Sequence, residues 1–84
     1  MILVTGGTGL VGSHLLYYLS LENDTVKAIH RKNSDLEAVK NIFSYFSEDF
    51  ETIFKKIQWI EADIMDVTSL VLAFKNVTEV YHAA

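Results

Sequence analysis

Residues 5–12 read T-G-G-T-G-L-V-G and contain all four glycines of a chain of 84 residues. At the average glycine usage of about 7%, roughly six glycines would be scattered along such a chain. The loop follows residues 1–5, an apolar and partly β-branched run typical of a strand buried on both faces of a parallel sheet. It leads into residues 10–21, where apolar side chains recur at helical spacing. We therefore predict a strand, a glycine-rich turn and a helix in direct succession.

The rest of the chain continues this alternation. Asn23, which tolerates the left-handed conformation, fits the end of the first helix. Ser34 and Glu37 form a capping-box pattern, which predicts a second helix that starts there. Residues 47–49 (S-E-D) look like a fresh helix start, which favours two helices over one long one. The remaining elements are predicted from their apolar runs: strands at residues 25–30, 57–62 and 78–82, and a short helix at residues 67–74.

The order of these elements, β-α-β-α-β-α-β, indicates the fold class. Strands that alternate with helices imply parallel strands joined by right-handed crossovers, with helices on both faces of the sheet. We therefore predict a doubly wound α/β fold. No internal repeat, low-complexity segment or linker divides the chain, so residues 1–84 should form one domain or part of one.

Composition and charge exclude several classes of protein. The chain is 50% apolar and 21% charged, a balance typical of a globular domain rather than a disordered or coiled-coil chain. The absence of cysteine excludes a disulfide scaffold and a thiolate metal site. A net charge of -4 argues against nucleic-acid binding, which needs a basic surface. The first residues contain neither a signal peptide nor a membrane span, so we expect a cytoplasmic protein.

The strand-loop-helix context gives the glycine loop a chemical interpretation. G-x-G-x-x-G between a strand and a helix is the fingerprint of dinucleotide-binding folds. Gly6 and the glycine after it would allow a tight turn with positive φ. Gly9 would let a pyrophosphate approach the backbone, and Gly12 would let the helix pack closely on the sheet. The amides of Leu10 and Val11 would lie at the helix N-terminus, where the helix dipole favours an anion.

The loop has two alternative interpretations. In a P-loop, G-x-x-x-x-G-K-[ST], counting from Gly7 places the second glycine at Gly12, but Ser13 occupies the lysine position. An NTPase is therefore not expected. The other alternative is a glycine-rich turn that connects a strand to a helix and binds nothing.

Three motifs together resemble a known family. They are T-G-G-T-G-L-V-G-S-H-L at residues 5–15, A-D-I-M-D at residues 62–66 and Y-H-A-A at residues 81–84. In this order and spacing they resemble the N-terminal half of an extended short-chain dehydrogenase/reductase, and they are similar to the NAD-dependent epimerase/dehydratase group. The resemblance spans essentially the whole chain. It implies the N-terminal portion of a Rossmann fold that binds NAD(P), with hydride transfer at a carbonyl or hydroxyl carbon in the complete protein.

The end of the second predicted strand bears on the choice of cofactor. NAD-binding folds place an acidic side chain about 20 residues past the glycines, on the ribose 2'-hydroxyl, whereas NADP-binding folds offer arginine to the 2'-phosphate. Here the strand ends His30-Arg31-Lys32, without an Asp or Glu. Arg31 and Lys32 therefore favour NADP(H) over NAD(H), because a guanidinium forms charge-assisted bonds with phosphate. They resemble the basic strand end of dihydroflavonol-reductase-like members. The alternative is that both are ordinary solvated charges.

Further cofactor contacts are implied by the resemblance. Asp63 follows the third predicted strand, so its carboxylate can reach the crevice at the carboxyl ends of the strands. Family members use this aspartate to accept from the adenine amino group, while the next amide, here that of Ile64, donates to the ring. They place small residues, here Ala83 and Ala84, beside the adenosine ribose and the nicotinamide. Asp66 is predicted to cap the following helix, and a cap is also the alternative for Asp63.

The histidines and phenylalanines favour structural roles. His14, His30 and His82 have no carboxylate or cysteine spaced with them as a ligand set, so we expect packing or capping rather than a metal site. An aromatic stripe at helical spacing is predicted to be a helix face that covers the sheet; it consists of Phe43, Phe46, Phe50 and Phe54.

The catalytic residues of the resembled family are missing. Its general acid/base is a Tyr-x-x-x-Lys pair, and Tyr17, Tyr18 and Tyr45 are not followed by lysine four positions later. Tyr81 stands too near the end. We therefore assign no catalytic residue and expect an N-terminal fragment of a larger fold, whose catalytic half lies beyond Ala84.

Three functional classes stay open at this point. The first is an NADP-dependent enzyme, the second a non-catalytic NADP-binding regulator or sensor on the same fold, and the third a packing domain that binds no nucleotide. A Tyr-x-x-x-Lys pair in the complete reading frame would separate the first from the second. We expect a dinucleotide and, in the complete protein, a small-molecule substrate as partners, with neither nucleic acid nor membrane; a homodimer is left open.

Overall fold

The computed structural model of the chain describes residues 1–63 and 65–83. Strands and helices alternate in it as the apolar pattern predicts. In chain order they are β1 (Ile2–Thr5), α1 (Leu10–Glu22), β2 (Val26–His30), α2 (Leu36–Phe46), α3 (Phe50–Phe54), β3 (Ile57–Glu61), α4 (Val67–Ala73) and β4 (Glu79–His82). The predicted break within the long apolar stretch is confirmed, because α2 ends at Phe46 and α3 begins at Phe50.

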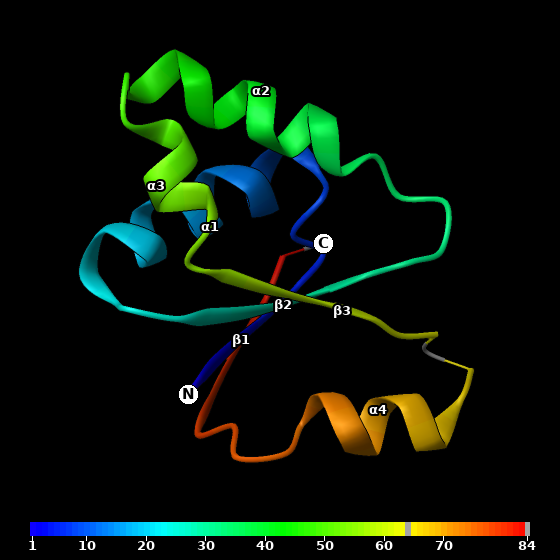
Figure 1. The fold of residues 1–84 in the computed structure, drawn as a ribbon. Helices are drawn as coiled ribbons and strands as arrows, with labels where there is room; N and C mark the ends of the chain where they lie inside the picture. The colour runs from blue at the N-terminus through cyan, green and yellow to red at the C-terminus, as the bar shows by residue number, and fades with distance from the viewer. Residues whose placement is uncertain (64, 84) are drawn as a thin grey trace.

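The strands form one parallel sheet in the order β3-β2-β1-β4. Figure 1 shows α1, α2 and α3 on one face of this sheet and α4 on the other. The doubly wound α/β fold of Rossmann type is therefore confirmed. Because every strand runs in the same direction, the loops that follow the four strands gather at one edge of the sheet.

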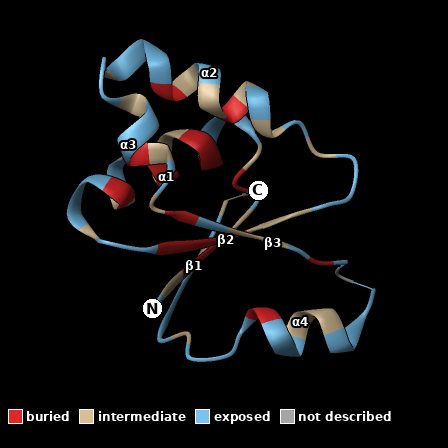
Figure 2. Cartoon of the chain, in the orientation of Figure 1, coloured by how far each residue is buried: buried red, intermediate tan, exposed pale blue. Residues whose placement is uncertain are grey.

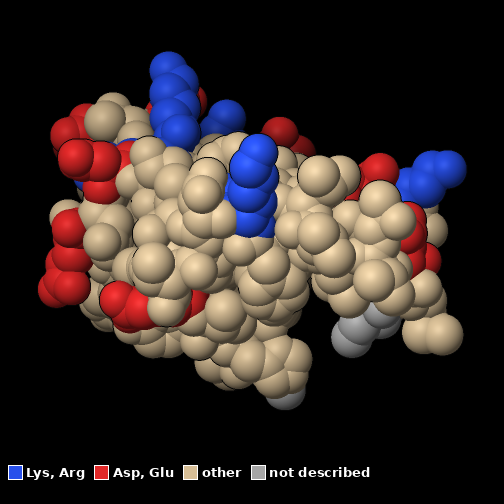
Figure 3. Space-filling model, turned by 90° about the horizontal axis from the view of Figure 1, so that it is seen from below, with Lys and Arg blue, Asp and Glu red and all other residues tan. Residues whose placement is uncertain are grey.

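The hydrophobic core lies between the sheet and the three helices above it (Figure 2). Its fully buried members include Val4, Val26 and Ala28 from the strands and Leu16 and Phe43 from the helices. The opposite face is covered less completely. Figure 3 views the molecule from that side, where uncharged surface predominates over α4. Large apolar side chains are exposed there on α4 and its neighbours: Val67, Val71, Leu72, Phe74 and Val80.

The aromatic stripe covers a neighbouring helix more than the sheet, so its predicted target is only partly right. Phe43 is fully buried, with its ring 5.3 Å from that of Tyr17 on α1 and 5.6 Å from that of Phe54 on α3. Phe46 is 42% exposed and stacks at 5.0 Å on Tyr17. Phe54 alone reaches the sheet through an aromatic contact, with Trp59 on β3 at 6.1 Å. The reason is that α1 lies between α2 and the sheet.

The end of α1 differs from the left-handed stop suggested by Asn23. Asn23 is extended, with φ -128° and ψ 143°. Its backbone N–H and its side-chain amide both donate to the carbonyl of Leu19, at 3.0 and 2.9 Å. The side chain therefore ends the helix by a hydrogen bond, which removes the need for a left-handed residue.

The prediction that Ser34 and Glu37 form a capping box at the start of α2 is wrong. The N-cap is Asp35, whose carboxylate accepts from the amide of Ala38 at 3.1 Å. Ser34 instead closes a turn: its hydroxyl accepts from the amide of Arg31 at 3.0 Å, and its own amide donates to the carbonyl of Arg31 at 3.1 Å. The hydroxyl is thus held by the end of β2 and is directed away from the helix.

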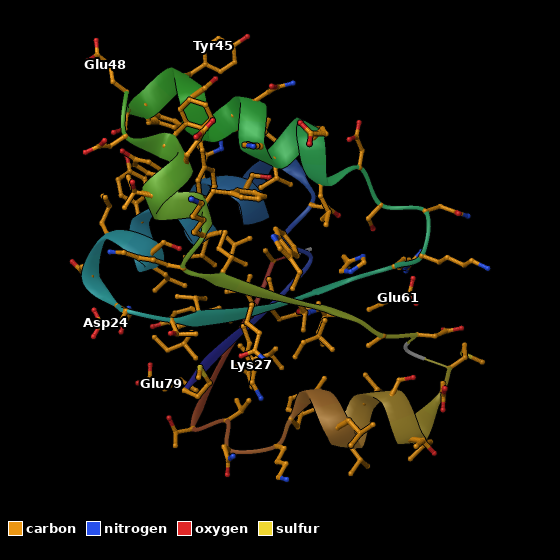
Figure 4. The ribbon with its side chains drawn as sticks, in the orientation of Figure 1. Asp24, Lys27, Tyr45, Glu48, Glu61 and Glu79 are labelled. Atoms are coloured by element: carbon orange, nitrogen blue, oxygen red, sulfur yellow. The ribbon has the colours of Figure 1, made fainter. Side chains whose placement is uncertain are left out.

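A buried lysine ties the α4 side of the molecule to the sheet. Lys27 on β2 is 8% exposed, and its ammonium donates to the carbonyl of Lys75 at 2.8 Å. Figure 4 shows this side chain pointing from the sheet toward the α4 side. The bond anchors the connection between α4 and β4. No helix within residues 1–63 and 65–83 is long and apolar enough to cross a membrane.

Candidate functional site

The glycine loop forms a closed turn at the carboxyl end of β1. Gly6 has φ +72°, so the predicted positive φ is confirmed there, whereas the glycine after it does not adopt one. The amide of Gly9 donates to the carbonyl of Gly6 at 3.2 Å. The hydroxyl of Ser13, fully buried on α1, donates to the carbonyls of Gly7 and Gly9 at 3.1 and 2.7 Å. Ser13 therefore fixes the loop to the first turns of α1 by hydrogen bonds.

Gly6 and Gly12 are required by contacts with backbone atoms inside the protein, whereas an added Cβ at Gly7 would meet only the end of a leucine side chain. A Cβ at Gly6 would overlap the carbonyl oxygen of Ala83, and one at Gly12 would overlap that of Gly6. A Cβ at Gly7 would lie 2.7 Å from Cδ1 of Leu16. Gly12 thus packs α1 against the loop, and the prediction that it packs the helix on the sheet is corrected on this point.

Gly9 is different from the other three. A Cβ there would have the carbonyl oxygen of Gly6 as its nearest neighbour, at the ordinary contact distance of 3.6 Å. Its φ of -77° and ψ of 172° are open to any residue. The protein itself therefore has no steric need for a glycine at this position. The surface of Gly9 suits a group outside the protein that must come close to the backbone.

The start of α1 lacks the side-chain cap that α2 and α4 have. Gly9 is its N-cap and supplies no side-chain hydrogen bond, and its first turn has no acidic residue. By contrast, Asp35 caps α2 and Asp66 caps α4. Leu10 and Val11 begin α1 and are 69% and 66% exposed. Since the first amides of a helix have no partner within it, this terminus can bind an anion.

Two hollows run along the carboxyl ends of the strands. The smaller, of about 430 Å³, lies beside the glycine loop and is lined by Thr5, Gly6, Thr8, Ile29, His30, Arg31, Ser34, Ala62, Leu70, His82 and Ala83. The larger, of about 800 Å³, is lined by Arg31, Lys32, Asn33, Ser34, Glu61, Ala62, Asp63, Met65, Asp66 and Ser69. They share Arg31, Ser34 and Ala62, so they are neighbouring parts of one crevice.

The fold brings most of the predicted site residues to this crevice. Gly6 and Ala83 line its smaller part, Lys32 and Asp63 its larger part, and Arg31 both. Gly9, Leu10, Val11 and Gly12 belong to the adjoining loop and helix start. Ile64 and Ala84 lie outside the described residues.

The two aspartates after β3 make local hydrogen bonds. The carboxylate of Asp63 accepts from the amide of Met65 at 2.9 Å, a local turn contact. The N-cap of α4 is Asp66, so Asp63 does not have the capping role given as its alternative. Asp66 caps α4 as predicted, accepting from the amide of Thr68 at 3.1 Å and from the hydroxyl of Ser69 at 2.8 Å. The hydrogen bond from the Ser69 hydroxyl, followed by those from backbone amides, lowers the pKa of Asp66 below its ordinary value.

The histidines make local contacts. The ring of His14 bonds the carbonyl of Leu10 at 2.7 Å, and that of His30 bonds the carbonyl of Arg31 at 2.8 Å. His82 bonds the hydroxyl of Thr5, which joins the ends of β4 and β1 in the wall of the smaller hollow. Among residues 1–63 and 65–83, no three His, Asp or Glu side chains are grouped so that they could hold a metal ion.

Ser34 and Glu61 are polar residues of the crevice that were not predicted from the sequence as site residues. Ser34 was interpreted as a helix cap, although its hydroxyl closes the turn that follows β2. Glu61 lines the larger hollow with Arg31 and Lys32. Its position at the end of β3, two residues before Asp63, was the signal available in the sequence.

The fold and the glycine loop define a class of dinucleotide-binding α/β protein, and comparisons with known proteins give the family. Residues 3–84 match the family described as GDP-mannose 4,6 dehydratase, so the chain belongs to that family. This confirms the resemblance to the epimerase/dehydratase group of extended short-chain dehydrogenases/reductases. A sequence comparison with curated proteins gave no match.

Solved structures with the same fold include reductases. The structure of gox2253 has a TM-score of 0.75 and 26% identity, over 100% of this chain and 22% of its own. AtPrR2, solved with NADP+ and (+)pinoresinol, has a TM-score of 0.72 and 28% identity, over 99% and 25%. Isoflavone reductase has a TM-score of 0.69 and 29% identity, over 99% and 26%. The chain therefore spans about a quarter of the length of these proteins and has the fold of the part of each that it matches.

Proposed function

We propose that this chain is the cofactor-binding part of an NADP(H)-dependent enzyme that acts by hydride transfer, as a reductase, epimerase or dehydratase. The observation that carries the proposal is the exposed Gly9, which no contact inside the protein requires to be glycine. It forms the start of a helix that has no side-chain cap. A backbone that is open and has free amides suits a pyrophosphate.

The residues of the crevice fit the rest of a dinucleotide. The amides of Leu10 and Val11 would bind the pyrophosphate, with Gly6, Gly9 and Gly12 shaping the loop. Asp63, with the amide of Ile64, would hold adenine in the larger hollow. Ala83 and Ala84 would leave room on the ribose and nicotinamide side. In this arrangement the adenosine part would lie beside β2 and β3 and the nicotinamide part beside β4.

Arg31 and Lys32 would select NADP(H) at the 2'-phosphate. Both side chains are exposed and line the larger hollow. The turn closed by Ser34 holds the backbone of Arg31 at both its amide and its carbonyl. A guanidinium fixed at its base loses less freedom when it binds a phosphate. The solved relative AtPrR2 was determined with NADP+, which supports this choice.

The bound cofactor would supply the hydride. Residues of this chain would bind it, orient it and leave its nicotinamide side unobstructed. The tyrosine that serves as general acid/base in the resembled family, and the lysine that activates it, would come from sequence outside this stretch.

The experiment is a calorimetric titration of the complete protein with NADPH and NADH. We expect tighter binding of NADPH, and Arg31→Ala should weaken it about tenfold or more while changing NADH binding little, because a charged hydrogen bond contributes about 1.5–3 kcal/mol. Lys55→Ala, which removes an exposed cation at the C-terminal end of α3 that lines neither hollow, is the control. Equal affinity for the two dinucleotides, or unchanged NADPH affinity in Arg31→Ala, would contradict the assignment.

A further inference from the structure

The larger hollow contains charges of both signs. Arg31 and Lys32 contribute two positive charges, and Glu61, Asp63 and Asp66 contribute three negative ones. A ribose bound in this hollow would therefore meet negative side chains as well as the positive ones that follow β2. This inference rests on the proposed function, since it concerns which dinucleotide the site prefers.

Glu61 is brought to Arg31 by the register of the sheet. His30, the last residue of β2, pairs with Glu61, the last residue of β3. The next backbone contact is the hydrogen bond from the amide of Ala62 to the carbonyl of His30, at 3.0 Å. Glu61 precedes one partner of this bond and Arg31 follows the other. Since neighbouring strands lie about 4.8 Å apart, the two side chains start from adjacent points of the same sheet edge.

The direction of the Glu61 side chain agrees with this placement. Figure 4 shows it pointing from the end of β3 toward the segment that follows β2. Glu61 is exposed, so its carboxylate can face a ligand in the hollow. The other two carboxylates are engaged by nearby backbone amides, Asp63 by that of Met65 and Asp66 by that of Thr68. Glu61 is therefore the carboxylate that the strand pairing places beside the end of β2, next to Arg31.

We propose that Glu61 is the counter-charge to Arg31 in the cofactor site and lowers the preference of the protein for NADP(H) over NAD(H). A carboxylate repels a 2'-phosphate and accepts a hydrogen bond from a 2'-hydroxyl. In NAD-binding folds this acidic residue stands at the end of the second strand. Here the parallel register provides it from the third strand instead. The protein accordingly binds both dinucleotides, with a preference set by the balance of Arg31 and Glu61.

The test is Glu61→Gln in the complete protein, with NADPH and NADH titrated by calorimetry. Removing one negative charge near a phosphate in a half-exposed site should tighten NADPH binding about fivefold. NADH binding should stay unchanged or weaken, so the ratio of the two affinities rises. Glu51→Gln on α3 makes the same change of net charge away from the hollow and should leave the ratio as it is.

The outcomes separate the two proposals. If Glu61→Gln leaves the ratio of affinities unchanged, or shifts both affinities equally, the role of Glu61 is wrong while cofactor binding stands. If the native protein binds neither dinucleotide, the proposed function itself is wrong. A double variant, Arg31→Ala with Glu61→Gln, adds a further check: the effect of Glu61→Gln on NADPH should change when Arg31 is absent, because the two charges act on one phosphate.

Discussion

Substitution of Gly9 and Gly12 by alanine separates the binding role of the glycine loop from its structural role. Both changes add one methyl group to the same turn. At Gly12 the new Cβ would overlap the carbonyl oxygen of Gly6 and come within 2.8 Å of Cα of Gly7. All of these neighbours are backbone atoms, so no rotamer change can relieve them. At Gly9 the nearest atom, the carbonyl oxygen of Gly6, stays 3.6 Å away.

The expected stability changes follow from these contacts. Overpacking against a fixed backbone costs about 3 kcal/mol, and the better helix propensity of alanine at Gly12, inside α1, returns about 1 kcal/mol. Gly12→Ala should therefore lower the free energy of unfolding by about 2 kcal/mol. At Gly9, alanine is a poorer N-cap by up to about 1 kcal/mol, which the lower entropy of the unfolded chain offsets by a similar amount. Gly9→Ala should keep native stability within about 0.5 kcal/mol.

For Gly9→Ala we expect a large loss of NADPH affinity although stability is almost unchanged. Its methyl group would occupy the space from which a pyrophosphate approaches the backbone, so NADPH affinity should fall about tenfold or more, which is about 1.4 kcal/mol. Denaturant unfolding followed by circular dichroism measures stability, and calorimetric titration of the folded variant measures affinity. Gly9→Ala that binds NADPH like the native protein would refute the proposed approach of the pyrophosphate. Gly9→Ala that unfolds as easily as Gly12→Ala would show that the loop itself needs this glycine.

The core and the α4 cap provide two further predictions. Phe43→Ala removes a fully buried ring from contact with Tyr17 and Phe54 and should cost about 3–5 kcal/mol of unfolding free energy, whereas Phe46→Ala, 42% exposed, should cost less than half as much in the same denaturant assay. Asp66 has a lowered pKa in the folded state, so its charge adds stability above the unfolded-state pKa of about 3.9 and loses it as the pH falls through the folded-state value. Asp66→Asn keeps an oxygen that can cap the helix but does not titrate. The native protein should therefore be more stable than this variant at neutral pH, and the difference in unfolding free energy should shrink as the pH is lowered below about 4. A difference that stays constant down to low pH would contradict the assigned cause.

Most of the secondary structure follows from local pattern in the sequence. Apolar residues at a spacing of 3.6 define α2, and short apolar runs define the strands. The bounds of α1 were predicted, but its buried face was not, since it includes Ser13 and Ser20 while Val11 and Tyr18 are exposed. Asp66 was correctly assigned as a cap, because a helix start needs an acceptor for its first amides. The cap of α2 was assigned one residue too early, to Ser34 instead of Asp35, because two neighbouring residues both carried suitable oxygens. Local pattern could not decide between them.

Long-range contacts explain the other differences. The structural need for Gly6 and Gly12 depends on the carbonyls of Ala83 and Gly6, and the first of these contacts joins opposite ends of the chain. The aromatic stripe, similarly, could be recognised as a buried face but not matched to its partner. Phe43 packs on Tyr17 and Phe54 because α1 and α3 occupy the space next to it.

By itself the sequence determined the parallel α/β order and the place of the glycine loop, because both depend on residues that are neighbours along the chain. It also located Arg31 at the end of a strand. The tertiary structure decided which side chain of another strand lies beside the end of β2. Glu61 comes from a different strand, and only the pairing of His30 with Glu61 places its charge in the hollow with Arg31. Electrostatic forces act through space, so the charge that a cofactor would meet depends on the register of the sheet.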